Sequence, residues 1–446
     1  MNIDDIGIEA FSEKELSAYF DYVRQPSISA QGVGIQETVA ILKEKFAHLH
    51  PDDFQIWHEF GGNPVLFASF KGQSDQTVLF YNHYDVQPPE PLEEWLSPAF
   101  EPAIRDGKIF ARGISDDKGE LISRLIVLDY MQKTGALPIN VKFVLEGEEE
   151  IGSPNISKYL DAHKKELAAD LCIWEGGEKN EFDQFQVQLG SKGIAAFEMS
   201  VQTANKDIHS RMGGVIENAA KRLIAAIASL MNEDGSPKIS HLRDDAEPLT
   251  SKEQDFITSM PFDQDLFKKT YGLLCPLISR NPQQELVNGN TLTISGFQSG
   301  YTGPGVKTII PKSATAKGDI RLVPGQKPER VIELLKKQLA DNGFSDVQVM
   351  LANGTEAYRS SSENTFVQAA IRTARKDYGQ DIVVVPNMSG AGPSKAFNRA
   401  LHVPIIMVGV NYVGKAAHSP NENIRLNDFK EGSKYLRDLL TAYALI

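Results

Sequence analysis

Three short apolar runs in the first half of the chain give its clearest structural signal. Residues 77–81, 141–145 and 171–174 are rich in the β-branched and aromatic side chains that favour strands. Between the first two runs, residues 120–133 carry apolar side chains at helical spacing after a polar, turn-forming stretch. Strands that alternate with helices in this way predict a mostly parallel sheet.

Acidic and histidine side chains lie just beyond each of these predicted strands. His83 and Asp85 follow the first run. Glu149 and Glu150 follow the second run, and Glu175 follows the third. Because ligand-binding groups gather beyond the carboxyl ends of parallel strands, side chains separated by about a hundred positions are expected to converge at one edge of the sheet.

The pattern changes after residue 190. Residues 195–201 alternate between apolar and polar side chains, and residues 291–295 and 313–322 are also expected to form strands. Helical spacing is found at residues 218–231 and 328–339. Strands and helices in this mixed order predict a smaller α+β layer.

The α/β pattern returns near the end of the chain. It predicts a helix over residues 365–378 and strands at 382–385 and within 405–410. At the start of the chain, residues 16–23 are expected to form an amphipathic helix. The first and last parts therefore form one core domain that an inserted domain interrupts.

The predicted division of the chain follows from these changes of pattern. The core domain comprises residues 1–190 and 358–446, and the insertion comprises residues 191–357. A length of 446 residues agrees with two or three domains of ordinary size. Within the insertion, residues 234–284 are polar, contain several prolines and show no clear period, so no structure is predicted for them.

Composition excludes several classes of protein. The net charge is -13, with basic residues scattered along the chain, which argues against a nucleic-acid partner. No apolar run approaches the ~20 residues that span a bilayer, so no membrane insertion is expected. Cys172 and Cys275 are the only cysteines, and Met1 to Asp5 do not begin a secretion signal. A cytoplasmic location is therefore expected.

The polar groups beyond the strands are typical of a two-metal hydrolase. Two divalent ions can activate water and polarise a carbonyl group. A set of His, Asp and Glu without thiolate suits zinc, and also manganese or cobalt. Glu149 and Glu150 could divide two tasks, one as a ligand and the other as a proton carrier.

Each of these features has an ordinary structural explanation. Acidic runs such as 148–150 are usually solvated surface. The stretch 116–119 could be only a turn that caps the next helix. A single His83 or His418 is more often a satisfied core or surface residue. The joint occurrence of these groups after successive strands makes the metal site the better interpretation.

Ordered motifs along nearly the whole chain resemble the M20 family of dinuclear metallopeptidases and deacylases. They begin with His83-x-Asp85 and continue at residues 112–119, 146–153, 207–214, 307–311, 319–324 and 417–422. The Thr-Gly-Pro-Gly stretch at 302–305 is most similar to the branch of cytosolic non-specific dipeptidases and carnosinases. This resemblance implies an α/β catalytic domain with helices on both faces of a mostly parallel sheet, interrupted by a smaller α+β lid that also forms a homodimer.

The resemblance also implies which residues bind two divalent metal ions per subunit. His83, Asp116 and Glu175 would bind one ion, and Asp116, Glu150 and His418 would bind the other, so that Asp116 is the bridge. Zinc is the expected metal, with manganese or cobalt as alternatives.

Further roles are implied for residues around the metals. Glu149 would be the general base and acid, and Asp85 would orient His83. The lid would contribute His209 to stabilise the oxyanion, within its own subunit or across a dimer. Arg321 would bind a substrate carboxylate, and Gly390, in the glycine-rich stretch 389–394, would lie beside the carboxyl end of the substrate. Alternatively, His209 is part of a helix-cap turn and Arg321 of a structural ion pair.

Three functions are compatible with this pattern. The leading hypothesis is a dipeptidase that cleaves dipeptides or short peptides. The second is an N-acyl-amino-acid deacylase, similar to acetylornithine deacetylase or succinyl-diaminopimelate desuccinylase, because Glu175 occupies a position that is often Glu in deacylases and often Asp in dipeptidases. The third is an inactive relative with a binding role, which the presence of every expected ligand and of Glu149 disfavours.

Overall fold

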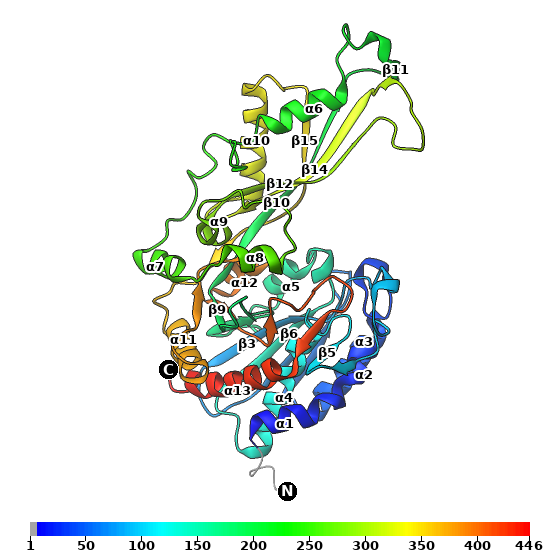
Figure 1. Cartoon of the computed structure of the whole chain (residues 1–446). Coiled ribbons are helices and arrows are strands. Elements are labelled where there is room, and N and C mark those ends of the chain that lie inside the picture. The colour runs from blue at the N-terminus through cyan, green and yellow to red at the C-terminus, as the bar shows by residue number, and fades with distance from the viewer. Residues whose placement is uncertain (1–6) are drawn as a thin grey trace.

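The computed structural model describes residues 7–446. Figure 1 shows an α/β body, here called the core, and an elongated second body above it, here called the lid. Met1 to Asp5, on which the expectation about secretion rests, lie outside the described residues. Among the helices in this part of the chain, none is both long and apolar enough to cross a bilayer.

An eight-stranded sheet forms the centre of the core. Its order is β1 (Asp53–Trp57), β2 (Val65–Phe70), β6 (Asn140–Glu146), β3 (Thr77–His83), β7 (Leu171–Trp174), β19 (Ile405–Met407), β9 (Gln186–Gln188) and β17 (Val383–Val385). The neighbours β6, β3, β7 and β19 run parallel to one another, as do β9 and β17. The pairs β1–β2, β2–β6 and β19–β9 are antiparallel. The predicted mostly parallel sheet is confirmed.

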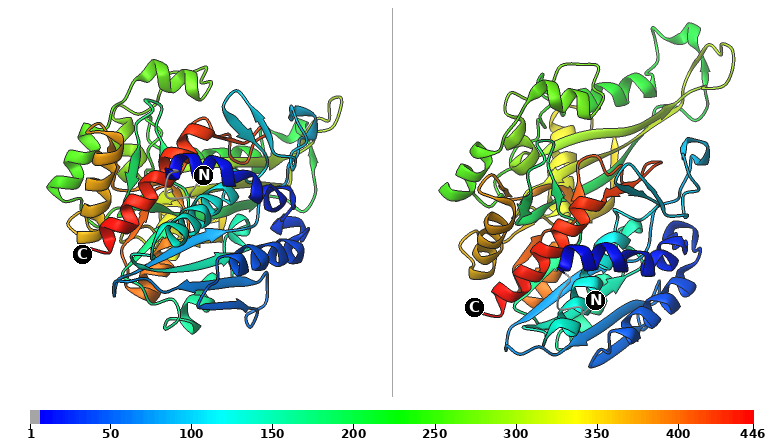
Figure 2. Two further views of the ribbon diagram at one scale, coloured as in Figure 1. Left: turned by 90° about the horizontal axis from the view of Figure 1, so that it is seen from below. Right: turned by 60° about the horizontal axis from the view of Figure 1, so that its bottom comes forward.

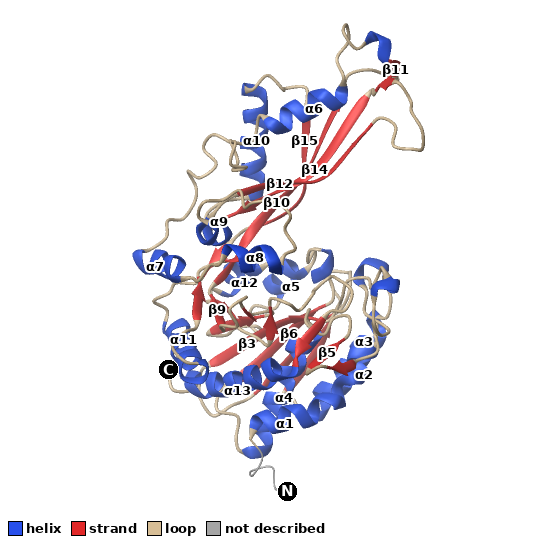
Figure 3. Ribbon diagram, viewed as in Figure 1, coloured by secondary structure: helices blue, strands red, loops and turns tan. Residues whose placement is uncertain are grey.

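Helices cover both faces of this sheet (Figure 3). The reason is visible in β3, where Val78 and Phe80 pack into one apolar cluster while Leu79 and Tyr81 pack into another on the opposite face. The first face is covered by α1 (Ile8–Glu15), α2 (Phe20–Arg24), α3 (Ile35–His48), α4 (Lys118–Thr134), α11 (Thr365–Tyr378) and α13 (Leu426–Tyr443). The second face is covered by α5 (Ile156–Ala162) and α12 (Ser394–Leu401).

Short strands frame the edge of the core sheet. β4 (Ala103–Arg105), β5 (Lys108–Phe110) and β21 (Asn423–Arg425) form one small sheet. β8 (Glu178–Lys179) pairs with β20 (Asn411–Tyr412), which places the chain after Glu175 beside the segment that leads to His418.

The lid is built on an antiparallel sheet with its own apolar cluster. Its strands are β12 (Thr291–Ser299), β14 (Ser313–Leu322), β10 (Gly190–Gln202) and β15 (Gln348–Thr355), in that order. Two helices, α6 (Ala219–Ala228) and α10 (Pro328–Asp341), pack on it. A small two-stranded antiparallel sheet of β11 (Ile208–His209) and β13 (Ile309–Ile310) lies at the far tip (Figure 1). The predicted smaller α+β layer is therefore confirmed.

β10 belongs to both bodies. Its first residues pair with β16 (Tyr358–Arg359) and β18 (Met388–Ala391), and its later residues pair with the lid strands β14 and β15. The right view in Figure 2 shows the lid extending away from the core. β10 runs through the predicted boundary near residue 190, so no break in structure marks it. The domain boundaries near residues 190 and 357 therefore stay predictions.

Two local predictions differ from the structure. In place of one helix over residues 16–23, the chain forms a 3-10 turn at Leu16–Tyr19, which follows α1, and then the short helix α2. The unassigned stretch 234–284 contains α7 (Ser251–Ser259) and α8 (Gln264–Thr270), and α9 (Pro282–Asn288) begins at its end. Asp263 caps α8 through a hydrogen bond from the backbone N–H of Leu266, and such single-turn signals do not produce an apolar period.

Candidate metal centre

The carboxyl ends of three adjacent parallel strands bring the candidate ligands together. His83 is the last residue of β3 and pairs in register with Glu146, the last residue of β6. Glu149 and Glu150 begin the short 3-10 turn that follows β6, and Glu175 follows β7 directly. The convergence expected from the sequence therefore occurs at one edge of the sheet.

Asp116 lies between two histidines. Its Oδ1 is 3.0 Å from Nε2 of His83, and its Oδ2 is 3.1 Å from Nε2 of His418. Each histidine nitrogen also contacts one further carboxylate, Glu175 at 3.2 Å from His83 and Glu150 at 3.2 Å from His418. The five side chains thus form two groups that share the carboxylate of Asp116.

The chemistry of this cluster fits divalent metal ions. Ligand atoms placed tetrahedrally at ~2.0–2.1 Å around zinc lie ~3.3 Å apart, close to the separations just given. In addition, Oε1 of Glu150 and Oδ1 of Asp117 are buried without a hydrogen-bond partner. Buried carboxylate oxygens are costly when nothing satisfies them, and a bound cation would do so. The cluster is a candidate site for divalent metal.

The electrostatics of the cluster support the same conclusion. Burial, and then repulsion by Asp116 and Glu150, raises the pKa of Glu149 to about 8. Hydrogen bonds to Asp116 and Glu150 raise the pKa of His418 to about 10. In the protein without metal, the histidines therefore act as the cations of an anionic cluster, and metal ions would take over that role.

Asp117 is a member of this cluster that the sequence did not single out. Asp117, His83 and Glu175 lie close enough together to form a further candidate set of metal ligands. However, Oδ2 of Asp117 already accepts hydrogen bonds from Nδ2 of Asn82 at 2.5 Å and from the backbone N–H of His83 at 3.2 Å. Arg124 in turn donates to Asn82, at 2.6 Å. Asp117 therefore anchors the end of β3 to the start of α4.

Asp85 connects His83 to the turn that carries the two glutamates. Its backbone oxygen lies 3.0 Å from Nδ1 of His83, and its Oδ1 lies 3.4 Å from the same nitrogen. Its carboxylate also accepts hydrogen bonds from the backbone N–H groups of Glu149 and Glu150, at 3.3 and 3.1 Å. The fully buried Asp85 side chain thus fixes the relative position of these residues.

A buried ion pair holds the loops of Asp116 and His418 together. Glu422 accepts a hydrogen bond from Arg112 at 2.7 Å and three more from the backbone N–H groups of Gly113, Ser115 and Asp116. Glu422 and Arg112 are each 1% exposed. His418 itself has φ of 61°, in the left-handed region that non-glycine residues rarely adopt, so the contacts of Glu422 stabilise a strained loop.

The cluster opens into a cleft of about 600 Å³ between the core and the lid. Asp116, Glu149, Glu175 and His418 line its floor, and the β18 segment with Gly390 lines one side. Phe267 of α8 and residues just before and after this helix line the cleft from the lid side. The stretch for which the sequence predicted no structure therefore forms part of this site.

Two predicted site residues do not reach the cleft within one chain. His209 is exposed in β11 at the tip of the lid, where its Nδ1 accepts a hydrogen bond from the backbone N–H of Arg211 at 3.2 Å. Arg321 lies on β14, 3.4 Å from Asp319, and does not line the cleft. The structure thus brings the five proposed ligands together at the cleft, and Glu149, Asp85 and Gly390 lie there with them. It does not bring His209 or Arg321 to the cleft.

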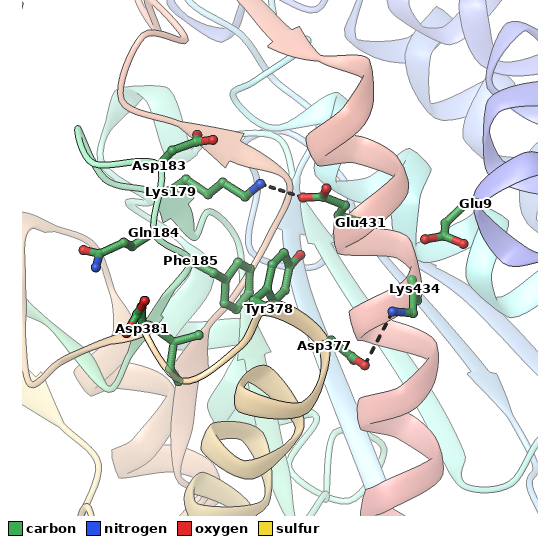
Figure 4. Close-up of a pocket in the computed structure, with 11 residues that line it drawn as sticks. Glu9, Lys179, Asp183, Gln184, Phe185, Asp377, Tyr378, Asp381, Glu431 and Lys434 are labelled. Atoms are coloured by element: carbon green, nitrogen blue, oxygen red, sulfur yellow. Dashed lines mark hydrogen bonds and ion pairs between the residues drawn. The ribbon is translucent and has the colours of Figure 1, made fainter.

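A second hollow, of about 410 Å³, lies beside α11 and α13 and away from the candidate ligands (Figure 4). Its charges largely pair with one another. Lys179 contacts Glu431 at 2.6 Å, and Lys434 contacts Asp377 at 3.8 Å. These ion pairs connect α13 to its neighbours, so we interpret this hollow as structural.

Comparison with known sequences and structures identifies the family. Residues 79–442 match the model of peptidase family M20/M25/M40. The chain is 26% identical over 388 residues to the Beta-Ala-His dipeptidase of Homo sapiens, covering 83% of this chain and 76% of that protein. It is also 26% identical over 406 residues to the Cys-Gly metallodipeptidase dug1 of Schizosaccharomyces pombe, covering 85% and 83%.

A solved structure agrees with this match along almost the whole chain. The M20 family metallo-carboxypeptidase Sso-CP2 from Sulfolobus solfataricus is 35% identical, with a TM-score of 0.88 and coverage of 97% of this chain and 100% of that one. The chain therefore belongs to peptidase family M20/M25/M40.

Proposed function

We propose that this protein is a metal-dependent dipeptidase that hydrolyses the peptide bond of dipeptides and other short peptides. The observation that carries the proposal is the position of Asp116, whose two carboxylate oxygens each contact a different histidine of the cluster. A shared carboxylate between two ligand groups is the arrangement that a two-metal hydrolase needs. The dipeptidase names of two relatives support the choice of substrate.

The proposed ligand sets follow the contacts of the cluster. His83, Asp116 and Glu175 would hold one ion, and Asp116, Glu150 and His418 would hold the other. We propose zinc as the metal, because imidazole and carboxylate groups are ordinary zinc ligands, with manganese or cobalt as alternatives. When bound, two such ions lower the pKa of water and polarise a substrate carbonyl group.

Glu149 is the proposed proton carrier. It lines the cleft beside the ligands, whereas the neighbouring Glu150 contacts His418 and accepts a hydrogen bond from Gln87. Glu149 would take a proton from the attacking water and return it to the leaving amine. Asp85 keeps Glu149 in place by accepting a hydrogen bond from its backbone N–H. Gly390 lines the cleft, and its backbone would contact the carboxyl end of the substrate.

A homodimer would complete the site. Because β11, which carries His209, lies at the tip of the lid (Figure 1) and His209 does not line the cleft of its own chain, we propose that it serves the cleft of a second copy and stabilises the oxyanion there. The lid exposes apolar Val215 and Ile224, at 81% and 55%, which a partner subunit could cover. Arg321 stays a candidate for binding the substrate carboxylate in that assembly.

The proposed setting is a reducing cytoplasm. Cys172 is buried, Cys275 is exposed, and both are free thiols. With a net charge of -13, the partners we propose are small peptide substrates and a second copy of the chain, without nucleic acid or membrane.

A substrate panel tests the reaction. Metal-stripped protein would be assayed on dipeptides and on N-acyl amino acids, before and after addition of zinc, manganese or cobalt. We expect metal to restore activity on dipeptides that carry a free α-amine. If metal restores activity only on N-acyl amino acids, the protein is a deacylase and not a dipeptidase. Inactivity with all three metals would contradict both the dipeptidase and the deacylase hypothesis.

Mixing two inactive variants tests the shared site. If His209 acts across the dimer, a heterodimer of His209→Ala and Glu149→Gln subunits contains one intact site, made from Glu149 of the first and His209 of the second. In an equal mixture half of the dimers are heterodimers, so we expect unfolding and refolding of the mixed variants to restore up to about a quarter of the wild-type rate, measured by dipeptide hydrolysis. Each variant refolded alone is the control, and a mixture as inactive as its components would assign His209 to its own subunit or to no role.

A further inference from the structure

The lid presents three aromatic side chains that belong to no apolar core. Phe262, Phe267 and Tyr271 lie along α8 and its two ends, with ring centroids 5.4 Å apart for the first pair and 4.6 Å for the second. The two phenylalanines are half-buried, and Tyr271 is 56% exposed. Within residues 7–446, none of the three belongs to or packs against any of the four apolar clusters.

These rings face the metal centre across the cleft. All three line the same 600 Å³ cleft as Asp116, Glu149 and His418, and Figure 1 shows α8 between the lid sheet and the core. Met260 and Leu286 extend the apolar surface on the lid side. Aromatic surface left in contact with water is unfavourable in proportion to its area, and a wall of it opposite polar catalytic groups is typical of a ligand site.

We propose that this aromatic wall binds a large apolar side chain of the substrate, so that the enzyme prefers dipeptides containing leucine or an aromatic residue. The inference rests on the proposed dipeptidase function and specifies its substrate class.

The charge of the cleft limits the alternatives. Two divalent ions would balance the acidic groups of the centre, and Lys415 balances Glu178 at 2.9 Å, whereas Glu181 adds a negative charge to the lining. An acidic side chain on the substrate would be repelled by Glu181, and a glycine would leave the aromatic rings in contact with water. Apolar dipeptides are therefore expected to rank above glycyl and acidic ones.

The substitution Phe267→Ala removes the middle ring. Phe267 also borders an open hollow of about 1130 Å³ in the lid, which is separate from the hollow of Figure 4, so its truncation creates no cavity in a closed core. Alanine also keeps the helical propensity of α8. The matched control is Phe60→Ala. Phe60 is 37% exposed, packs on Tyr159 at 5.0 Å and lies outside the cleft lining.

The measurement is kcat/KM for Gly-Gly, Leu-Gly, Gly-Leu and Asp-Gly with wild type and both variants, with melting temperatures as a check on folding. We expect wild type to favour at least one leucine dipeptide over Gly-Gly by roughly 10-fold or more. Phe267→Ala is expected to remove most of this preference by lowering kcat/KM for the leucine dipeptide, and Phe60→Ala is expected to leave the preference unchanged.

The outcomes separate this inference from the proposed function. If dipeptides are hydrolysed without a leucine preference, or if the preference survives Phe267→Ala, the aromatic wall does not bind the substrate side chain. The proposed dipeptidase function would still stand. If no dipeptide is cleaved, the proposed function fails. The wall is then tested by the same comparison between N-acyl-leucine and N-acyl-glycine, where loss of selectivity in Phe267→Ala would support it and unchanged selectivity would refute it.

Discussion

Glu149→Gln is expected to lower the rate of dipeptide hydrolysis by about 10²–10⁴-fold while leaving metal binding intact. Glutamine has almost the same shape as glutamate, but its amide cannot accept and return a proton at neutral pH. Asp85 holds the backbone N–H of residue 149, so the turn keeps its geometry in the variant. The loss would therefore report the proton-transfer role and not a change of structure. The measurement combines kcat and KM with metal content per subunit.

The neighbouring glutamates supply matched controls for this experiment. Glu148 accepts hydrogen bonds from the backbone N–H of Asn63 at 3.1 Å and from Nδ2 of Asn155 at 2.9 Å, away from the ligands, so Glu148→Gln should keep most of the activity. Glu150 contacts His418, so Glu150→Gln should lose both metal and activity. If Glu149→Gln turns over dipeptides at the wild-type rate, Glu149 is not the proton carrier.

The main features of the core were predictable because their signals are local. Apolar runs of strand length, a helical period between them and polar groups just after each run are all visible in short windows of sequence. The rule that ligands gather beyond the carboxyl ends of parallel strands then placed His83 and Glu175 together, and the contacts of β3 with β6 and β7 agree.

The parts that were not predicted depend on contacts between distant segments. Arg112 pairs with Glu422, which lies 310 residues away in the sequence, and nothing in the sequence near either residue predicts this contact. The short helix α8 contains only seven residues, too few to show an apolar period, and its rings face a cleft instead of a core. The 3-10 turn at Leu16–Tyr19 contains no proline or glycine that would mark it in the sequence.

Asp116→Asn is expected to remove the bridge between the two ligand groups and thereby lower the metal content below two ions per subunit. Asparagine keeps one oxygen, so it can serve at most one of the two histidine sides that Asp116 now contacts. Metal at ~100 times its Kd stabilises a protein by about 2.7 kcal/mol per site, so wild type should melt at a clearly higher temperature with metal than after chelation. This increase should shrink in the variant, and dipeptide hydrolysis should fall to near background.

Asp117→Asn is the decisive comparison, because Asp117 lies next in sequence and also lies close to His83 and Glu175. Its Oδ2 is occupied by hydrogen bonds from Asn82 and from the backbone of His83, and its side chain is almost fully buried. We therefore expect Asp117→Asn to lower the melting temperature of the metal-free protein while keeping two metal ions per subunit. Metal content measured by elemental analysis, together with melting curves with and without metal, separates the two aspartates. Loss of metal from Asp117→Asn with retention in Asp116→Asn would show that the bridge is Asp117, because a bridging carboxylate is the one ligand that both ions lose together.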